Sequence, residues 1–408
     1  MAARPIEETF IGLDIGTTKV CCIVGLLEEG SALPSIIGIG QAPTAGLRKG
    51  VVIDVEETVS SITAAVDEAE RISGIEIDRA TIGIDGSHIE SLNSTGVIAV
   101  GHEINEDDIQ RVQEAASAVH LPPNREILQV FPRSYSVDSQ LNIKDPIGIN
   151  GVRLEADVHI ITGGTPALKN LHRCIYQAGI DIEGQVLIPV AAASAVLSKK
   201  QREIGAAIID IGGGTTGIAV YEEGEVLYTN ILPLGAGHIT NDLAIGLRTS
   251  IDIAEKIKLG YVKARHAKSS STEKIRIEEL DGDEAVVSRR ELDRITGARL
   301  EEIMHMVKDD LKKISRSGML PGGVVITGGG AKMPGIDDLA KEILELPASI
   351  GRPEQISGIS DKIHDPSFAA PVGLMLENMH YSAGGDRTNV RLGQTVDKIK
   401  KTLRNLLP

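Results

Sequence analysis

The stretch Ala206-Ala207-Ile208-Ile209-Asp210-Ile211-Gly212-Gly213-Gly214-Thr215-Thr216-Gly217 decides the fold of this 408-residue chain, because a similar stretch occurs near the N-terminus. That second stretch is Phe10-Ile11-Gly12-Leu13-Asp14-Ile15-Gly16-Thr17-Thr18-Lys19. An apolar run and then a Glu-Glu-Gly turn follow each copy. The pattern predicts, twice, a strand, a tight glycine–threonine turn and a second strand. Two copies separated by nearly half the chain predict two related lobes.

The rest of the chain is arranged around this repeat. A third glycine-rich turn, in Val324 to Ala331, ends another apolar run and precedes a helical pattern over residues 336–344. Asn105 is the expected N-cap of a helix over 106–119. The domains that we expect are a first lobe at 1–84, 164–203 and about 365–381; an insert of strands and one helix at 85–163; a second lobe at 204–239 and 306–364; a second insert at 240–305, helical at both ends around a polar loop at 268–272; a flexible linker at 382–390; and a terminal helix at 391–408.

Composition excludes several classes of protein. Apolar residues make up 42% of the chain, which is enough to build a core, but aromatic residues only 2%, with no Trp. The net charge of −15 and the scarcity of aromatic rings argue against a nucleic-acid binder. Cys21, Cys22 and Cys174 have no metal or disulfide spacing, so we expect reduced core cysteines. With neither a signal peptide nor an apolar run of ~18 residues, the protein is expected to be soluble and intracellular.

The paired turns predict a nucleotide site. A triphosphate with Mg²⁺ needs carboxylates that orient the ion through its waters, and Asp14 and Asp210 each follow an apolar run. It also needs backbone N–H groups at close range, hydroxyl donors and positive charge. The expected phosphate-binding residues are Gly16, Gly212, Gly213 and Gly214, with Thr17, Thr18, Thr215, Thr216 and Lys19. Gly328, Gly329 and Gly330 would admit the ribose or adenine.

One such turn alone is more simply a β-hairpin turn. Two matched copies and a third glycine-rich turn favour ATP and Mg²⁺ instead. The chain contains no Gly-x-x-x-x-Gly-Lys-Ser/Thr motif, and no Gly-x-Gly-x-x-Gly follows its first strand. A P-loop is therefore excluded, and a dinucleotide fold is disfavoured.

These motifs, in this order, resemble those of the actin, Hsp70 and sugar-kinase superfamily. Within it the chain is most similar to the FtsA family of bacterial cell-division proteins, over essentially its whole length. The most diagnostic segments lie in the first insert: Gly86-Ser87-His88-Ile89, Asn93-Ser94-Thr95-Gly96, Asp145-Pro146-Ile147-Gly148, Gly151-Val152-Arg153-Leu154-Glu155 and Val158-His159-Ile160-Ile161-Thr162. The resemblance implies an α/β, actin-like two-lobed ATPase fold of duplicated ribonuclease-H-like domains, with an FtsA-type inserted subdomain and a C-terminal amphipathic helix.

The resemblance also assigns residues to the site. It places Asp14, Thr17, Thr18 and Lys19 in a first phosphate loop and the stretch from Asp210 to Thr216 in a second. Glu255 and Lys258 match a helix that contacts ribose and adenine. From the residues alone, a Glu and a Lys three apart on a helix are more simply a solvated ion pair.

Hydrolysis needs a group that orients water, and the sequence offers little for this task. Ile188 stands where several relatives carry a carboxylate, and Glu183 and Gln185 are the nearby candidates. We therefore predict ATP binding with slow hydrolysis at most. Nucleotide would then act as a conformational clamp that closes the lobes and controls self-association.

The terminal segment 391–408 is a predicted amphipathic helix. Drawn at about 100° per residue, its aliphatic residues fall within an arc of roughly 100°. A basic helix of this kind behind a linker suits an anionic membrane, although docking on its own domain or on a partner stays open. Partial immersion gives weak, reversible binding, so stable attachment implies several linked copies. The expected membrane-binding residues are Leu392, Val396, Ile399, Lys400, Lys401, Leu403, Arg404, Leu406 and Leu407.

The resemblance further implies partners. The second insert would receive the C-terminal peptide of the tubulin-like protein FtsZ through Arg290, Arg294 and Arg299, because Arg can fork onto carboxylates. These arginines have an equally good alternative in ion pairs with nearby acidic residues, namely Glu291, Asp293 and Glu301. Self-assembly into an actin-like filament, anionic lipids and later division membrane proteins complete the implied partners, at the cytoplasmic face of the inner membrane at the division site.

Three other functions share parts of this pattern. A small-metabolite kinase on the same fold would need a catalytic Asp and has no use for a basic tail. A pilus-assembly actin-like ATPase scaffold should lack the terminal lipid-binding helix. An Hsp70-type chaperone should carry a β-rich peptide-binding domain after the nucleotide domain.

Overall fold

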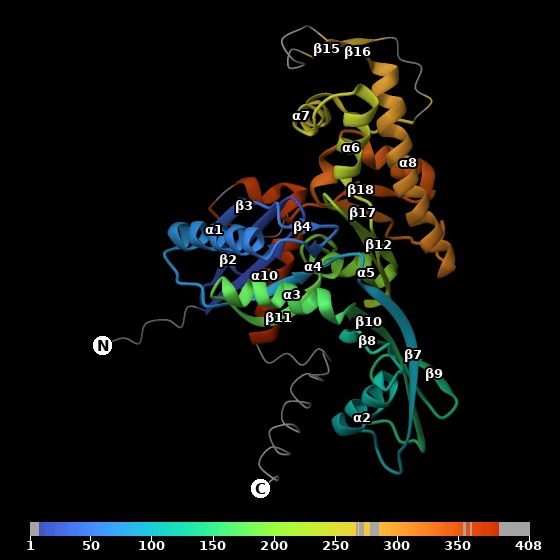
Figure 1. The fold of residues 1–408 in the computed structure, drawn as a ribbon. Coiled ribbons are helices and arrows are strands. Elements are labelled where there is room, and N and C mark those ends of the chain that lie inside the picture. The colour runs from blue at the N-terminus through green and yellow to red at the C-terminus, as the bar shows by residue number, and fades with distance from the viewer. Residues whose placement is uncertain are drawn as a thin grey trace. The chain divides into compact units, whose positions relative to one another are not determined.

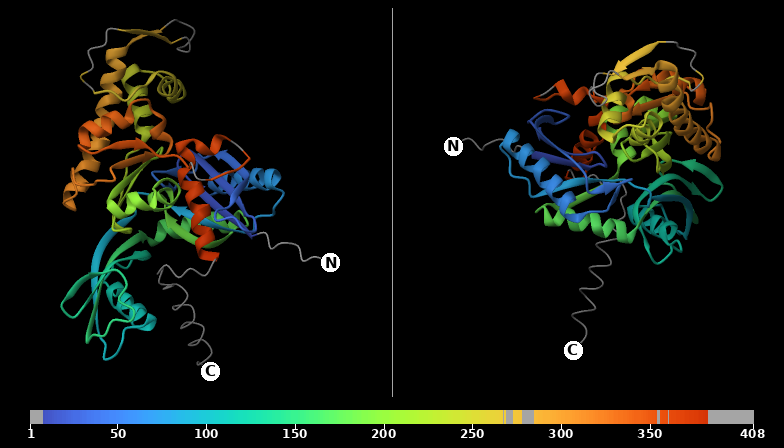
Figure 2. Two further views of the ribbon diagram at one scale, coloured as in Figure 1. Left: turned by 180° about the vertical axis from the view of Figure 1, so that it is seen from behind. Right: turned by 45° about the horizontal axis from the view of Figure 1, so that its top comes forward.

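The computed structural model describes residues 8–266, 268, 273–277, 285–353, 356–359 and 361–382. Within these residues the chain forms two compact units, and each is described by itself. The larger unit contains residues 8–90 and 164–382, and the smaller contains residues 91–163. Figure 1 labels their elements, and Figure 2 gives two further views.

The first lobe of the larger unit is built on a five-stranded sheet with the order β11-β6-β1-β2-β3. β1 pairs antiparallel with β2 and parallel with β6, and β11 pairs parallel with β6. The strands are β1 (Glu8–Ile15), β2 (Lys19–Leu27), β3 (Ser35–Pro43), β6 (Arg79–Ile84) and β11 (Asp181–Leu187). A two-stranded ribbon joins β4 (Leu47–Arg48) to β5 (Val51–Val52).

Helices pack against this sheet and bury the apolar residues of its strands. α1 packs on β3 and β2, and α10 packs on β1, β6 and α4. Gly12 of β1 is needed there, because a Cβ would lie 2.4 Å from the carbonyl oxygen of Pro371. The helices are α1 (Val55–Ser73), α3 (Thr165–Gln177), α4 (Ile188–Val196), α5 (Lys199–Ile204) and α10 (Ala369–Ser382).

The second lobe repeats the same strand pairing. Its sheet has the order β14-β13-β12-β17-β18, with β12 antiparallel to β13 and parallel to β17. The internal sequence repeat therefore corresponds to a repeat in strand pairing, with β1 and β12 in equivalent places. The strands are β12 (Ala206–Ile211), β13 (Thr216–Glu222), β14 (Glu225–Leu232), β17 (Val324–Thr327) and β18 (Ala348–Ile350).

Helices and a small hairpin complete this lobe. Its core joins sheet residues such as Ile209 and Ile218 to helix residues such as Leu292 and Leu339. The further elements are α6 (Ala236–Leu247), α7 (Ile251–Tyr261), β15 (Lys274–Ile277), β16 (Ala285–Ser288), α8 (Arg289–Lys313), α9 (Ile336–Leu344) and the 3-10 turns η1 (Gly329–Lys332), η2 (Asp361–His364) and η3 (Pro366–Phe368).

Three expectations can be compared with these elements. The helix predicted over 336–344 is confirmed as α9. The expected boundary between residues 305 and 306 falls inside α8, which continues unbroken to Lys313 because no Gly or Pro interrupts its second half. The polar stretch 268–272 lies, apart from Lys268, outside the described residues.

The smaller unit is a four-stranded sheet with one helix. Its strand order is β7-β10-β8-β9, and its core includes Val112 and Ala116 of α2 with Leu154 and Ile160 of β10. The predicted cap is confirmed, since the Asn105 side chain accepts the N–H of Asp108 in a capping box. The elements are β7 (Glu90–Ala99), α2 (Glu106–Ser117), β8 (Arg125–Val137), β9 (Gln140–Ile143) and β10 (Arg153–Gly164).

No helix in the described part of the chain combines the length and the apolar character needed to cross a membrane.

Candidate functional site

The two repeated turns have the same hydrogen bond. The Gly16 N–H donates to the Lys19 carbonyl at 3.0 Å, and the Gly212 N–H donates to the Thr215 carbonyl at 2.9 Å. Each turn therefore closes at the same point after its strand, directly beyond Asp14 in one lobe and Asp210 in the other.

The two turns also lie directly against each other. A Cβ built on Gly213 would lie 2.4 Å from Cγ2 of Thr18, and one built on Gly214 would lie 2.7 Å from Oγ1 of Thr17. A side chain at either glycine would have to displace Thr18 or Thr17, so the glycines let the two turns approach each other. The structure thus brings the two predicted phosphate loops together.

Asp14 and Asp210 influence each other electrostatically. Burial raises the pKa of Asp14 to about 6, with a smaller raising effect from Asp85 and an opposing effect from Lys19. Burial raises the pKa of Asp210 to about 8, and Asp14 and Asp85 raise it further. Buried carboxylates whose charges repel each other favour a bound cation, which would restore their ionised forms.

Asp85 is a further candidate for the site, and the sequence alone did not single it out. It follows β6, the strand beside β1, and the Thr215 hydroxyl donates a hydrogen bond to its Oδ2. A signal was present, because Ile84-Asp85-Gly86 is a third case of a buried apolar run ending in Asp before a glycine. It was not used because this segment has no repeated partner in the sequence.

Lys19 supplies positive charge at the first loop. Its Nζ lies 3.3 Å from both the carbonyl oxygen and Oγ of Ser367, and 4.6 Å from the ring centroid of Phe368. From this position it lowers the pKa of both Asp14 and Asp210.

The third glycine-rich turn contacts the second carboxylate. Gly328 has φ 81°, and a Cβ there would lie 2.2 Å from Oδ1 of Asp210. Gly329 faces open space, whereas Gly330 packs on Ile211. Beside this turn lies a cavity of about 390 Å³, whose lining includes Ala331, Lys332, Met333, Gly335, Arg352 and Asp365.

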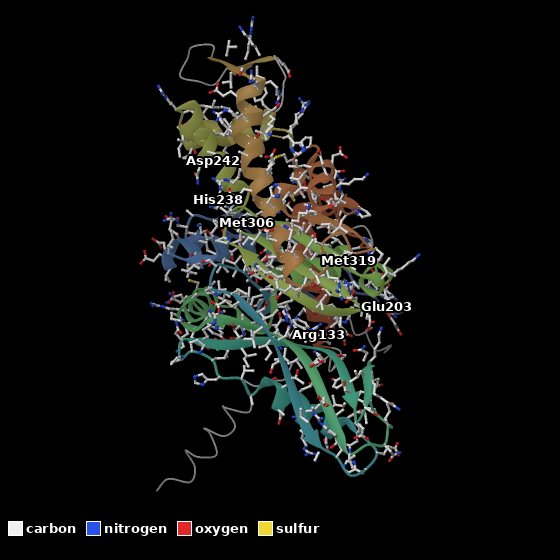
Figure 3. The ribbon with its side chains drawn as sticks, turned by 90° about the vertical axis from the view of Figure 1, so that its right-hand side faces the viewer. Arg133, Glu203, His238, Asp242, Met306 and Met319 are labelled. Atoms are coloured by element: carbon white, nitrogen blue, oxygen red, sulfur yellow. The ribbon has the colours of Figure 1, made fainter. Side chains whose placement is uncertain are left out.

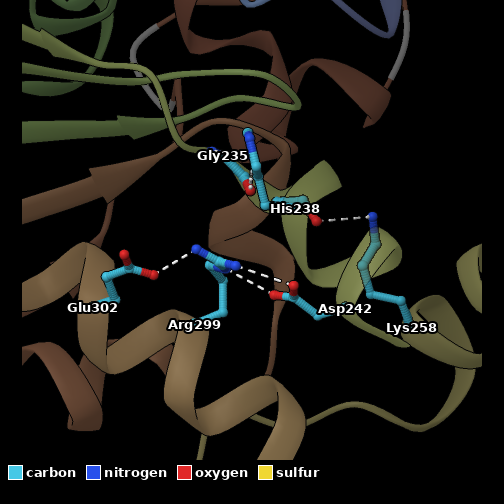
Figure 4. A network of polar contacts seen from close by, with 7 residues as sticks. Gly235, His238, Asp242, Lys258, Arg299 and Glu302 are labelled. Carbon is cyan, nitrogen blue, oxygen red and sulfur yellow. Dashed lines mark hydrogen bonds and ion pairs between the residues drawn. The ribbon is translucent and has the colours of Figure 1, made fainter. Parts of the chain in front are cut away.

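Glu255 and Lys258 do form the ion pair expected from their spacing, at 2.7 Å, but it is not fully solvated. The Lys258 side chain is only 12% exposed, and its Nζ also contacts the Thr240 hydroxyl at 2.9 Å and the Ala236 carbonyl oxygen. Figure 4 shows Lys258 reaching across to the start of α6. The pair therefore joins α7 to α6.

The three predicted partner-binding arginines differ in their surroundings. Arg299 forms a two-pronged pair with Asp242 at 2.7 and 3.0 Å and a further bond to Glu302 (Figure 4). Asp242 belongs to α6, one turn beyond His238 (Figure 3). Arg290 and Arg294 are exposed, and within the described chain neither forms an ion pair.

The candidates for orienting water lie elsewhere on the sheet. Glu183 accepts a hydrogen bond from Asn378 at 2.8 Å, and Gln185 contacts His172 at 2.9 Å. The register pairs Leu187 with Ile84, so both candidates lie further back along β11 than the strand end that Asp85 follows. The structure does not bring Glu183 or Gln185 together with the three aspartates.

The predicted Mg²⁺ site and the predicted membrane helix differ in how far the structure describes them. Among the residues that the structure describes, no group of three or more His, Cys, Asp or Glu side chains is placed to hold a metal ion directly. The linker and the membrane helix at 391–408, with all of its predicted lipid-binding residues, lie outside the described residues except for Ser382.

Two lobes with the same strand pairing and opposed glycine–threonine turns define an actin-like protein, which confirms the predicted fold class. Solved structures share this fold at 15% identity. The PilM–PilN type IV pilus biogenesis complex matches with a TM-score of 0.66, covering 90% of this chain and 98% of that one. MreB5 of Spiroplasma citri bound to ADP matches with a TM-score of 0.55, covering 93% and 99%.

Comparison of sequences gives the particular family. The family model "Cell division protein FtsA" matches residues 207–373, and "SHS2 domain inserted in FTSA" matches residues 86–162. The cell division protein FtsA of Pseudomonas aeruginosa is 37% identical over 94% of this chain and 93% of its own length. That of Borreliella burgdorferi is 41% identical over 91% of both. The chain belongs to the FtsA family of cell-division proteins.

Proposed function

We propose that this protein binds Mg²⁺·ATP between its two lobes, assembles on the inner membrane and tethers FtsZ filaments there, recruiting later division proteins. The observation that supports this most directly is the contact between the two glycine–threonine turns, each placed after a buried aspartate.

The site fits a magnesium-bound triphosphate. Gly16 and Gly212 to Gly214 would let the backbone approach phosphate oxygens once these displace the Thr17 and Thr18 side chains that now lie against Gly214 and Gly213. The Thr17 and Thr18 hydroxyls can then donate to the phosphates, whereas those of Thr215 and Thr216 already donate to Asp85 and to the Leu234 carbonyl. Asp14 and Asp210 would hold Mg²⁺ through its water shell, which suits an ion that keeps several waters. Bound Mg²⁺ neutralises charge on the phosphates, and Lys19 adds to that effect.

The adenosine is assigned to the far side of the second loop. Gly329 faces open space, and the preceding residue, Gly328, lies against Asp210. A ribose or base can therefore approach the backbone at Gly329. Lys258 and Glu255 hold α7 against α6 and would present the ribose-facing surface.

Hydrolysis is expected to be slow. The side chain of Ile188 packs onto β6, where a Cβ on Gly83 would lie 2.2 Å from its Cδ1. The first turn of α4 therefore places an apolar group against the sheet, and Glu183 and Gln185 are engaged with Asn378 and His172. Nucleotide serves mainly to set lobe closure and self-association.

Membrane and FtsZ binding use separate parts of the chain. The amphipathic segment 391–408 would lie in an anionic membrane surface, and assembly would multiply its weak affinity. Arg290 and Arg294 are one turn apart at the start of α8, and their exposure leaves them available to the carboxylates of an FtsZ C-terminal peptide. Arg299 is less suited to that role, because Asp242 and Glu302 already bind it.

The test combines nucleotide and lipid. The purified full chain should bind a fluorescent ATP analogue with Mg²⁺ and sediment with anionic liposomes, more strongly with ATP than without. A chain lacking residues 391–408 should still bind the analogue but remain in the supernatant. Failure of the full chain to bind nucleotide, or undiminished sedimentation of the shortened chain, would overturn the corresponding part of the proposal.

A further inference from the structure

Asp85 lies beside both loops of the proposed nucleotide site. The parallel register pairs Gly12 with Thr81 and Leu13 with Ile82. Continued by three residues, it places Asp85 level with Gly16 in the first loop. Side chains two residues apart on a strand share a face, so Asp85 is on the same face as Gly83, which is level with Asp14.

Neighbouring segments hold Asp85 close to both loops. The Thr215 hydroxyl of the second loop donates to Oδ2. Gly50 lies against Gly86, where a Cβ would be 2.5 Å from its Cα, and the Gly50 N–H donates to Oγ1 of Thr17 at 3.3 Å. Asp85 thus contacts one phosphate loop directly and is linked to the other through Gly50.

Among the described residues, the other carboxylate oxygen of Asp85, Oδ1, accepts no hydrogen bond comparable to the one from Thr215. Oδ1 is buried and accepts no hydrogen bond of full geometry in the described part of the chain, although the Gly86 N–H lies close enough to the carboxylate to lower its pKa. A buried carboxylate oxygen without a donor is costly in the free protein, because it has given up water without replacement. The molecule keeps this group beside two further carboxylates, and a triphosphate would add more negative charge.

We propose that Asp85 is a third carboxylate of the divalent-cation site, with Oδ2 fixed by Thr215 and Oδ1 accepting a hydrogen bond from the water shell of Mg²⁺. This inference rests on the proposed nucleotide function and adds a residue to it. Three carboxylates around one triphosphate make nucleotide affinity depend steeply on the divalent cation. Without the cation, Asp85 repels the phosphates; with it, Asp85 helps to hold them.

The test is the effect of Asp85→Asn on ATP-analogue affinity in excess Mg²⁺ and in excess EDTA. Asparagine keeps an oxygen for the Thr215 hydroxyl but removes the charge. In Mg²⁺ we expect affinity to fall about tenfold, the lower end of losses at residues that support a metal site. In EDTA we expect affinity to rise. The matched control is Asp78→Asn, at the exposed residue just before β6, which should leave both affinities unchanged.

The outcomes separate the inference from the proposed function. If the unaltered protein binds no nucleotide in Mg²⁺, the proposed function fails. If it binds and Asp85→Asn retains the same ratio of affinities in Mg²⁺ and EDTA, the inference alone is wrong, and Asp85 only fixes Thr215. Equal tightening in both conditions also overturns it, because Asp85 would then act by repulsion only.

A second pair of variants covers the case in which Asp85→Asn does not fold. Thr215→Val removes the hydroxyl that orients Asp85, whereas Thr215→Ser keeps it. We expect Thr215→Val to lower the ratio of the affinity in Mg²⁺ to that in EDTA and Thr215→Ser to restore it. The same ratio in both variants would contradict the proposed orientation of Asp85.

Discussion

At the residue scale, three carboxylates and one lysine set the electrostatics of the candidate site. Lys19 lowers the pKa of Asp14 and Asp210, and burial raises both. The sequence predicted Asp14 and Asp210 from the repeat, and Lys19 from its place in the first copy. It was insufficient for Asp85, whose partner Thr215 lies 130 positions away and is brought near only by the fold.

Lys19→Met should weaken binding of the Mg²⁺·ATP analogue by about tenfold, which corresponds to loss of a hydrogen bond to a charged group. The change removes positive charge but keeps a long side chain to pack on Phe368. Equilibrium titration with a fluorescent analogue measures it. Lys169→Met, on the exposed surface of α3, is the control and should bind as the parent does.

Asp210→Asn should stabilise the nucleotide-free protein at high pH. The folded-state pKa of Asp210, about 8, lies above its ordinary value of 3.8, so the folded protein holds this proton more tightly than the unfolded chain. The free energy of unfolding therefore falls as pH rises from about 4 to about 8, and the penalty is complete above that window. We expect Asp210→Asn to gain on the order of 2 kcal/mol at pH 8.5.

Denaturant unfolding without nucleotide, at pH 8.5 and pH 5, checks this expectation. The difference in free energy of unfolding between Asp210→Asn and the parent should be smaller at pH 5, because the Asp210 carboxyl of the folded parent is already protonated there. An equal difference at both pH values would show that the effect does not come from ionisation.

At the element scale, local signals in the sequence were reliable where they were self-contained. The capping residue Asn105 and the apolar period of α9 lie within their own elements, and both were predicted. The extent of α8 was not, since its continuation past residue 305 depends on packing of Val307 and Leu311 in the lobe core. The pairing of Arg299 with Asp242 likewise joins two elements that are far apart in the sequence.

Asn105→Ala should lower the stability of the smaller unit by about 1 kcal/mol, the usual cost of losing an N-cap. The change removes the Asn105 side-chain oxygen that accepts the Asp108 N–H, whereas the backbone N–H of residue 105 can still donate to the Asp108 carboxylate. Hydrogen exchange of α2 amides in the full chain measures the local effect. Gln110→Ala, exposed in the same helix, is the control, and an equal loss there would contradict the capping explanation.

At the scale of the whole molecule, the duplication explains why one pattern in the sequence predicted so much. The same pairing of three antiparallel strands with two parallel ones occurs in both lobes, so each lobe presents its aspartate and its turn in the same way. The sequence predicted that the two turns face each other, but not the particular contacts of Thr17 with Gly214 and of Thr18 with Gly213, because these depend on how the two lobes pack.

A double variant, Arg290→Glu with Arg294→Glu, should lower affinity for an FtsZ C-terminal peptide by about tenfold or more, since two favourable charge contacts become repulsive. Thermal stability should change little, because both side chains are exposed. Fluorescence anisotropy of a labelled peptide measures the affinity. The control, Lys312→Glu on the last turn of the same helix, changes the net charge half as much and should bind as the parent does. A loss of binding free energy half as large as that of the double variant would point to net charge instead of a local contact.

The length of α8 has a consequence for how binding of such a peptide would affect the rest of the second lobe. The helix runs unbroken for 25 residues, about 37 Å at about 1.5 Å per residue, from Arg289 to the turn where Asp310 bonds Asn230 of the second-lobe sheet. A rigid rod of this kind cannot tilt at one end alone. If ATP binding alters the tilt of α8 and so changes the affinity for the peptide, the peptide must change the affinity for ATP by the same factor. Attachment of an FtsZ filament would then alter nucleotide binding.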